Sequence, residues 1–159
     1  MPLSIGTQFF ILKQKAQEDA GLEIPVLGMS MWPQLLSGDL VLIKSQPQYS
    51  IGDVLVFKYQ TEILIHRLVQ IQDAVLLCKG DNTFRLEPIT DPDAIIGRAV
   101  SIKRSGKTFS VIPVLDDFIQ QSIAVNRVYM RTRSLYETRK SIEYIRFYKR
   151  RLFHYTDKE

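Results

Sequence analysis

A serine at position 30 is the residue of this chain whose surroundings best suit covalent chemistry. It lies in the middle of the sequence GMSMWP, residues 28–33. Gly28 lets the backbone approach another segment closely, and Pro33 stops a helix from running on. We therefore predict that Ser30 is held on a rigid turn at a strand end. Because Gly, Ser and Pro are also ordinary turn residues, this stretch alone does not establish chemistry.

A histidine at position 66 could act as the base for this serine. A serine hydroxyl is a weak nucleophile and needs a base within hydrogen-bonding distance. His66 lies in the apolar run ILIHRL, residues 63–68. In a strand, alternation places His66 on one face with Leu64 and Leu68, and Arg67 on the other face. A histidine on an apolar face is often a core residue, but a strand also holds a general base rigidly. Both interpretations stay open.

Two acidic residues follow at short distances and could orient the histidine. Asp81 belongs to the sequence KGDN, residues 79–82, and Glu87 stands six residues later. A carboxylate beside an imidazole fixes its tautomer and stabilises the imidazolium. Gly-Asp-Asn is equally a good turn sequence. The residues by themselves therefore leave the third member open.

Composition excludes several other kinds of site. The chain has 159 residues, of which 45% are hydrophobic and 24% charged, as expected for one globular domain with an appendage. The single cysteine, Cys78, rules out an intrachain disulfide, and two histidines far apart do not make a zinc signature. We expect no metal and no cofactor. Without a signal peptide or an apolar run of about 18 residues, we expect a soluble, cytoplasmic protein.

The order of local patterns predicts a β body between two helical segments. Apolar spacing predicts a helix over residues 7–20, and Pro25 predicts an edge strand over 22–27. Further β-type runs cover residues 39–44, 53–59, 62–71, 74–79, 94–103 and 107–111. Short strands at this spacing favour an antiparallel barrel or sandwich. We divide the chain into a helical segment 1–21, a β body 22–114 and a helical tail 115–159.

Six short blocks of this sequence occur together in a known superfamily. They are GxSMxP at 28–33, GD at 38–39, GDVLVF at 52–57, IHR at 65–67, KGDN at 79–82 and IGR at 96–98. In this order and spacing, residues 22–113 resemble the superfamily of signal peptidase I and the LexA-type self-cleaving repressors. The resemblance implies a mainly β, partly open barrel. It also implies serine acyl transfer, with Ser30 as nucleophile and its backbone amide as oxyanion donor.

The type of base distinguishes branches of this superfamily. In bacterial signal peptidases and LexA-type proteins a lysine occupies the position of His66. A histidine there is similar to the endoplasmic-reticulum and archaeal signal peptidases, which use serine, histidine and aspartate. In that branch two acids follow the KGDN block closely. Asp81 matches the first and Glu87 lies near the second, so the resemblance favours Asp81 slightly.

The resemblance implies a peptide or protein substrate that lies extended beside the serine. It assigns Gly28, Met29 and Met31 to substrate binding. We therefore predict a serine endopeptidase that cleaves a leader or precursor peptide. We expect neither a membrane anchor nor an N-terminal DNA-binding domain, and in this the chain would depart from its relatives. Two alternatives stay open: a self-cleaving LexA-type regulator and a catalytically silent peptide-binding module.

The tail carries the net charge of the chain. Residues 1–115 are balanced in charge, so residues 116–159 supply the whole net charge of +4. A helical pattern begins at Asp116, and its apolar face contains Leu115, Phe118, Ile119, Ser122 and Ile123. A second helical pattern covers 135–153, and arginine and aromatic residues are mixed over 128–155. Such a helix could pack its aromatics on the β body, lie peripherally on an anionic membrane, or dock a protein. We do not expect nucleic acid as a partner, because no binding fold accompanies the arginines.

Overall fold

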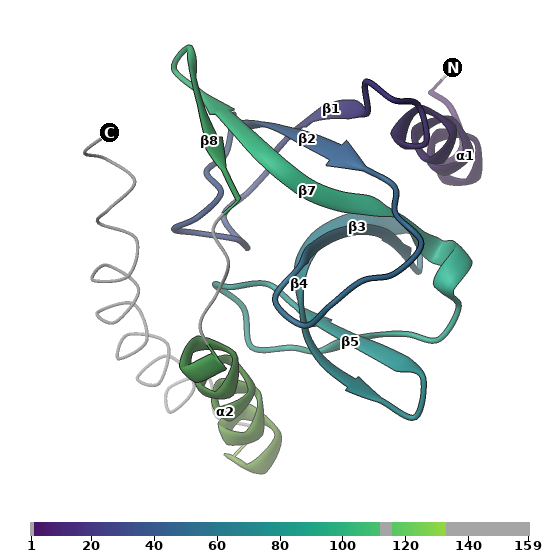
Figure 1. Cartoon of the computed structure of the whole chain (residues 1–159). Coiled ribbons are helices and arrows are strands. Elements are labelled where there is room, and N and C mark those ends of the chain that lie inside the picture. Colours follow the sequence, from purple (N-terminus) through teal and green to yellow (C-terminus); the bar gives the residue numbers. More distant parts are fainter. Residues whose placement is uncertain (1, 112–115, 133–159) are drawn as a thin grey trace.

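The protein is built on one antiparallel sheet flanked by two helices. The computed structural model describes residues 2–111 and 116–132. Its strands follow the order β1-β2-β7-β3-β4-β5-β6, and β8 pairs with β7 (Figure 1). Within the described residues β1 and β6 end this path without pairing with each other, so the sheet is not closed. The predicted mainly β fold with a helix at each end is confirmed.

The elements follow the chain in this order: α1 Ile5–Ala16, β1 Leu22–Pro25, β2 Leu40–Lys44, β3 Val54–Tyr59, β4 Glu62–Gln72, β5 Val75–Lys79, β6 Glu87–Ile89, a 3₁₀ turn Pro92–Ala94, β7 Ile95–Arg104, β8 Lys107–Ser110 and α2 Asp116–Thr132. The β-type runs predicted from the sequence coincide with β1 to β5, β7 and β8, with ends that differ by at most two residues.

The first helix is shorter than its sequence pattern suggests. The prediction covered residues 7–20, whereas α1 ends at Ala16 with Gln17 as its C-cap. Gly21 has a left-handed φ of 72° and leads directly into β1. A Cβ at this glycine would lie 2.7 Å from the carbonyl oxygen of Ile43. The close approach of β1 to β2 therefore fixes where the strand begins.

Strand β6 has no counterpart among the predicted strands. It contains only three residues, with Pro88 in the middle, and so shows no alternation that a sequence could reveal. Its position is set by pairing with β5, where Glu87 lies opposite Cys78. This short strand matters because it determines where the carboxylate of Glu87 points.

Apolar side chains gather in three clusters that divide the two faces of the sheet. One joins α1 to β2, β3 and β7 and includes Met31 and Leu35. A second covers the opposite face around Phe57 and Leu68. The third lies under α2 and includes Phe118. The two helices therefore pack against different parts of the sheet, at opposite ends of the body (Figure 1).

The helix predicted from Asp116 onward is α2, and the face predicted to be apolar is buried at Phe118, Ile119, Ser122 and Ile123. The helical pattern predicted over 135–153 and most of the aromatic tail lie outside the described residues. In the described part of the chain, no helix is long and apolar enough to cross a membrane.

Candidate active site

Ser30 lies on a turn that follows β1. Buried apolar side chains of this turn anchor it to the body. The amide of Trp32 donates to the carbonyl of Met29 at 3.1 Å, and that of Leu35 donates to the carbonyl of Met31 at 3.1 Å. Met31 and Leu35 are buried, while Ser30 is partly exposed. Two buried side chains beside a hydrogen-bonded turn hold the serine backbone in place.

The turn at residues 79–82 is hydrogen-bonded to the same segment. The backbone amide of Asn82 donates to the carbonyl of Ser30 at 2.7 Å. Its side-chain amide donates to the carbonyl of Met29 at 3.1 Å. A Cβ at Gly80 would lie 2.8 Å from the carbonyl oxygen of Ser30. The glycine therefore lets two loops, fifty residues apart in sequence, meet backbone to backbone.

The residues expected to bind substrate, Gly28, Met29 and Met31, differ in their exposure. Gly28 has a φ of 75°, and a Cβ there would meet nothing within 4 Å. Gly28 is thus suited to its left-handed conformation, and it is Gly80 that allows the close approach. Met31 was assigned to substrate binding, but its side chain is 1% exposed and its sulfur lies 3.4 Å from the amide nitrogen of Asp81. Met29, by contrast, is half exposed.

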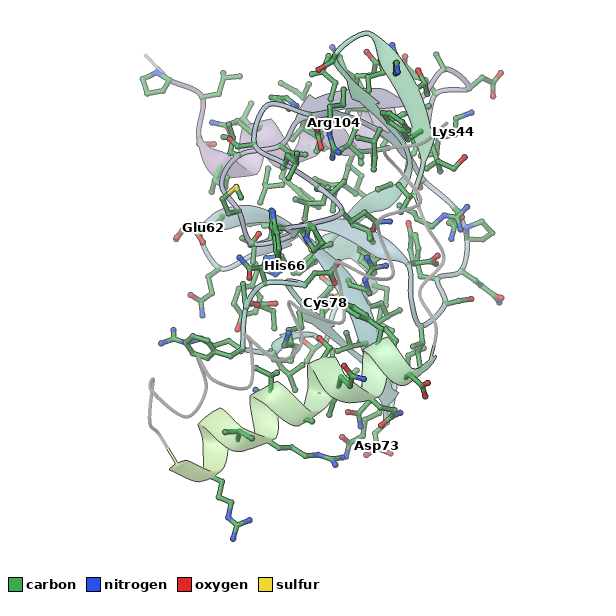
Figure 2. All side chains as sticks on the ribbon, turned by 90° about the vertical axis from the view of Figure 1, so that its left-hand side faces the viewer. Lys44, Glu62, His66, Asp73, Cys78 and Arg104 are labelled. Atoms are coloured by element: carbon green, nitrogen blue, oxygen red, sulfur yellow. The ribbon has the colours of Figure 1, made fainter. Side chains whose placement is uncertain are left out.

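His66 points from β4 to the face of the second apolar cluster, in the middle of the body in Figure 2. It is 6% exposed, and its Nδ1 lies 2.9 Å from Oε2 of Glu87. The Phe57 ring meets the imidazole edge to face at 6.5 Å between centroids. The histidine and glutamate come from β4 and β6, and β5 lies between them.

The small residue Cys78 stands on β5 directly opposite Glu87. Burial raises the pKa of the Cys78 thiol well above its usual range, and the charge of Glu87 raises it further. The thiol therefore stays protonated at neutral pH and is no nucleophile. The Glu87 carboxylate passes this position and reaches His66 on β4.

Asp81 has a different partner. Its two carboxylate oxygens accept from Nε and Nη2 of Arg67 at 2.9 and 2.7 Å. Both side chains are fully buried, and Arg67 also donates to Oε1 of Gln34 and to the carbonyl of Gly52, each at 2.7 Å. The slight preference for Asp81 over Glu87 is therefore not supported. Arg67 faces away from His66, and Asp81 lies with it.

The serine and the histidine are held separately. Within residues 2–111 and 116–132, no hydrogen bond joins the Ser30 hydroxyl to His66, and the Ser30 amide donates to no other residue. Catalytic hydrogen bonds commonly form only when a substrate is bound. An amide without an intramolecular acceptor can donate to a developing oxyanion.

Sequence reasoning missed a group of arginines that fix the Gly-Asp turns. Each aspartate of the three Gly-Asp dipeptides forms an ion pair with a strand arginine: Asp39 with Arg104 at 2.8 Å, Asp53 with Arg98 at 3.2 Å, and Asp81 with Arg67 at 2.7 Å. The recurrence of Gly-Asp was visible in the sequence. The partners were not, because each arginine is distant in the chain.

The electrostatics of Asp39 illustrate this support. Burial by itself raises the pKa of its carboxyl, but hydrogen bonds from Arg104 and from the Leu36 amide, together with the Arg104 charge, hold the pKa below its ordinary value. The Arg104 guanidinium also donates to the carbonyl of Gln34 at 3.0 Å. The end of the Ser30 loop is thus tied to β7 by a charged pair.

These features define a β protein whose serine sits on a rigid turn and whose histidine is bonded to a carboxylate. In the described part of the chain, no cluster of His, Cys, Asp or Glu side chains is arranged to hold a metal ion. The model of the Peptidase S24-like family matches residues 4–100, more than half of the chain. The chain belongs to this family, which confirms the superfamily expected from the six sequence blocks. Comparison with curated proteins gave no match.

Proposed function

We propose that this chain is a serine endopeptidase that cleaves a leader or precursor peptide, with Ser30 as nucleophile, His66 as general base and Glu87 as the residue that orients His66. The observation that carries the proposal is the 2.9 Å contact between Nδ1 of His66 and Oε2 of Glu87. A carboxylate in this position is what a histidine base requires.

The chemistry follows from the two ends of the imidazole. With its proton on Nδ1 and directed at Glu87, the ring presents Nε2 as the base. Ser30 Oγ attacks the peptide carbonyl while His66 accepts its proton. The imidazolium, stabilised by Glu87, then protonates the leaving amine, and a water molecule hydrolyses the acyl-enzyme by the same route. The Ser30 amide donates to the oxyanion.

We also propose the branch of the superfamily to which this chain belongs. A histidine between Ile65 and Arg67 is similar to the endoplasmic-reticulum and archaeal signal peptidases, and Glu87 would replace their aspartate. The exposed side chain of Met29 supports a substrate that lies extended beside Ser30. We place the reaction in the cytoplasm. The positive charge of residues 116–159 supports a peripheral contact with an anionic membrane or a protein.

The test is cleavage of a defined peptide library with small residues at varied positions, read by mass spectrometry. Ser30→Ala and His66→Ala should abolish cleavage. Ser37→Ala is the matched control, because Ser37 is exposed on the same loop and should leave cleavage intact. Cleavage that survives Ser30→Ala would contradict the proposal. Peptide binding without turnover would indicate a silent binding module, and a shift in the mass of the chain itself would indicate self-cleavage.

A further inference from the structure

The helix α2 begins after the residues matched by the family, and it covers a buried lysine beside the serine-holding turn. Lys79 is 1% exposed. Its Nζ donates to the hydroxyl of Ser122 on α2 at 2.8 Å and to the carbonyl of Gly80 at 3.0 Å. Burying an ammonium without hydrogen bonds is costly. The helix therefore supplies one of the acceptors that stabilise this buried lysine.

Two more contacts bind α2 to the same region. The Arg67 guanidinium lies over the Phe118 ring, with Cζ 5.9 Å from the ring centroid. Asn126 donates to the carbonyl of Phe84 at 2.9 Å. Val69 of β4 is buried in the cluster beneath the helix. The helix thus meets the sheet through apolar, polar and cationic groups together.

The groups that α2 covers are those that hold Ser30. Lys79 and Gly80 begin the turn whose Asn82 donates to the carbonyls of Met29 and Ser30. Arg67 reaches the same loop through Oε1 of Gln34. The coupling needs no direct contact between α2 and Ser30. One route runs from the helix through Lys79 and the 79–82 turn, and the other runs through Arg67 and Gln34.

We propose that α2 is a positioning element of the candidate active site, so that the docked helix fixes the turn at 79–82 and, through it, the Ser30 loop. Lys79 and Ser122 are positioning residues in this scheme. The part that concerns activity rests on the proposed function. Undocking would take the Ser122 hydroxyl away from the Lys79 ammonium and the Phe118 ring away from the Arg67 guanidinium, so both residues that lead to the Ser30 loop would lose a contact.

The experiment compares the full chain with Ser122→Ala, Asn126→Ala and Lys79→Met. Gln120→Ala is the control, since Gln120 is exposed on the same helix. Hydrogen exchange is followed at the amides of Trp32, Leu35 and Asn82, which are hydrogen-bonded in or to the Ser30 loop. Where cleavage is measurable, kcat and KM are determined for each variant.

We expect Ser122→Ala and Asn126→Ala to speed exchange at the three amides and to lower kcat by about tenfold with KM nearly unchanged. The control should match the wild type. Faster exchange along α2 with unchanged exchange at the loop would overturn the inference. If Lys79→Met does not fold, Ser122→Ala and Asn126→Ala test the inference. Exchange needs no substrate, so a protein without peptidase activity would refute the proposed function while the coupling of α2 to the loop is still tested.

Discussion

The two faces of β4 give neighbouring residues opposite tasks. His66 faces Glu87, and their side chains are 7% and 12% exposed. Arg67 faces Asp81 on the other side of the strand, and both side chains are fully buried. The alternation of a strand separates a pair suited to proton transfer from a pair suited to support. A change at Glu87 should therefore act mainly on activity, whereas a change at Arg67 or Asp81 should lower stability first and reach activity only through the Ser30 loop.

A change on the face of β4 that carries Arg67 should have the largest effect, a loss of stability. Arg67→Met would leave the buried carboxylate of Asp81 without its bidentate partner, so we expect the free energy of unfolding to fall by about 3–5 kcal/mol. Urea unfolding measures the change. Adding Asp81→Asn to Arg67→Met should recover part of the loss. A decrease below about 1 kcal/mol would show that the pair does not support the fold.

A change on the face of β4 that carries His66 should lower activity instead of stability. Glu87→Gln keeps the shape of the side chain but removes the charge that stabilises the imidazolium. We expect kcat to fall about 10²-fold, with a change in unfolding free energy of at most about 1 kcal/mol. Steady-state kinetics and urea unfolding on the same sample measure both. Asp81→Asn should lower the unfolding free energy by more than Glu87→Gln does, and equal losses of unfolding free energy in the two variants would break the distinction between the faces.

Two glycines test whether the support reaches the serine. Gly80→Ala would place a Cβ 2.8 Å from the Ser30 carbonyl and 2.7 Å from Cγ2 of Thr83. We expect a loss of about 1–3 kcal/mol of stability together with loss of cleavage. Gly28→Ala meets no neighbour and should cost only the left-handed conformation, about 1 kcal/mol. Similar results for both variants would contradict the close approach of the two loops.

The smallest effect concerns the acid response of Asp39. Its folded-state pKa lies below the ordinary value, so the stabilisation is present above that ordinary value and is lost as the pH falls through the folded-state pKa. Wild-type stability should therefore decline below about pH 4. Asp39→Asn should be less stable at pH 7 by about 1 kcal/mol and should flatten this decline. Urea unfolding at several pH values measures it.

Much of this architecture was determined locally by the sequence. Alternating apolar runs and Gly-containing turns predicted seven of the strands, because both signals act over a few residues. The same alternation placed His66 and Arg67 on opposite faces. The glycine and proline around Ser30 predicted its turn, and the spacing after Asp116 predicted α2.

Only the tertiary structure decided which acid meets the histidine. Asp81 was the nearer match in the sequence, but it turns to Arg67. Glu87 reaches His66 from β6, a strand too short and too rich in proline to show a pattern. Its position comes from the pairing of β6 with β5, which sets Glu87 opposite Cys78. The candidate nucleophile and base could be chosen from sequence, whereas their partners depend on contacts between distant segments that local patterns do not encode.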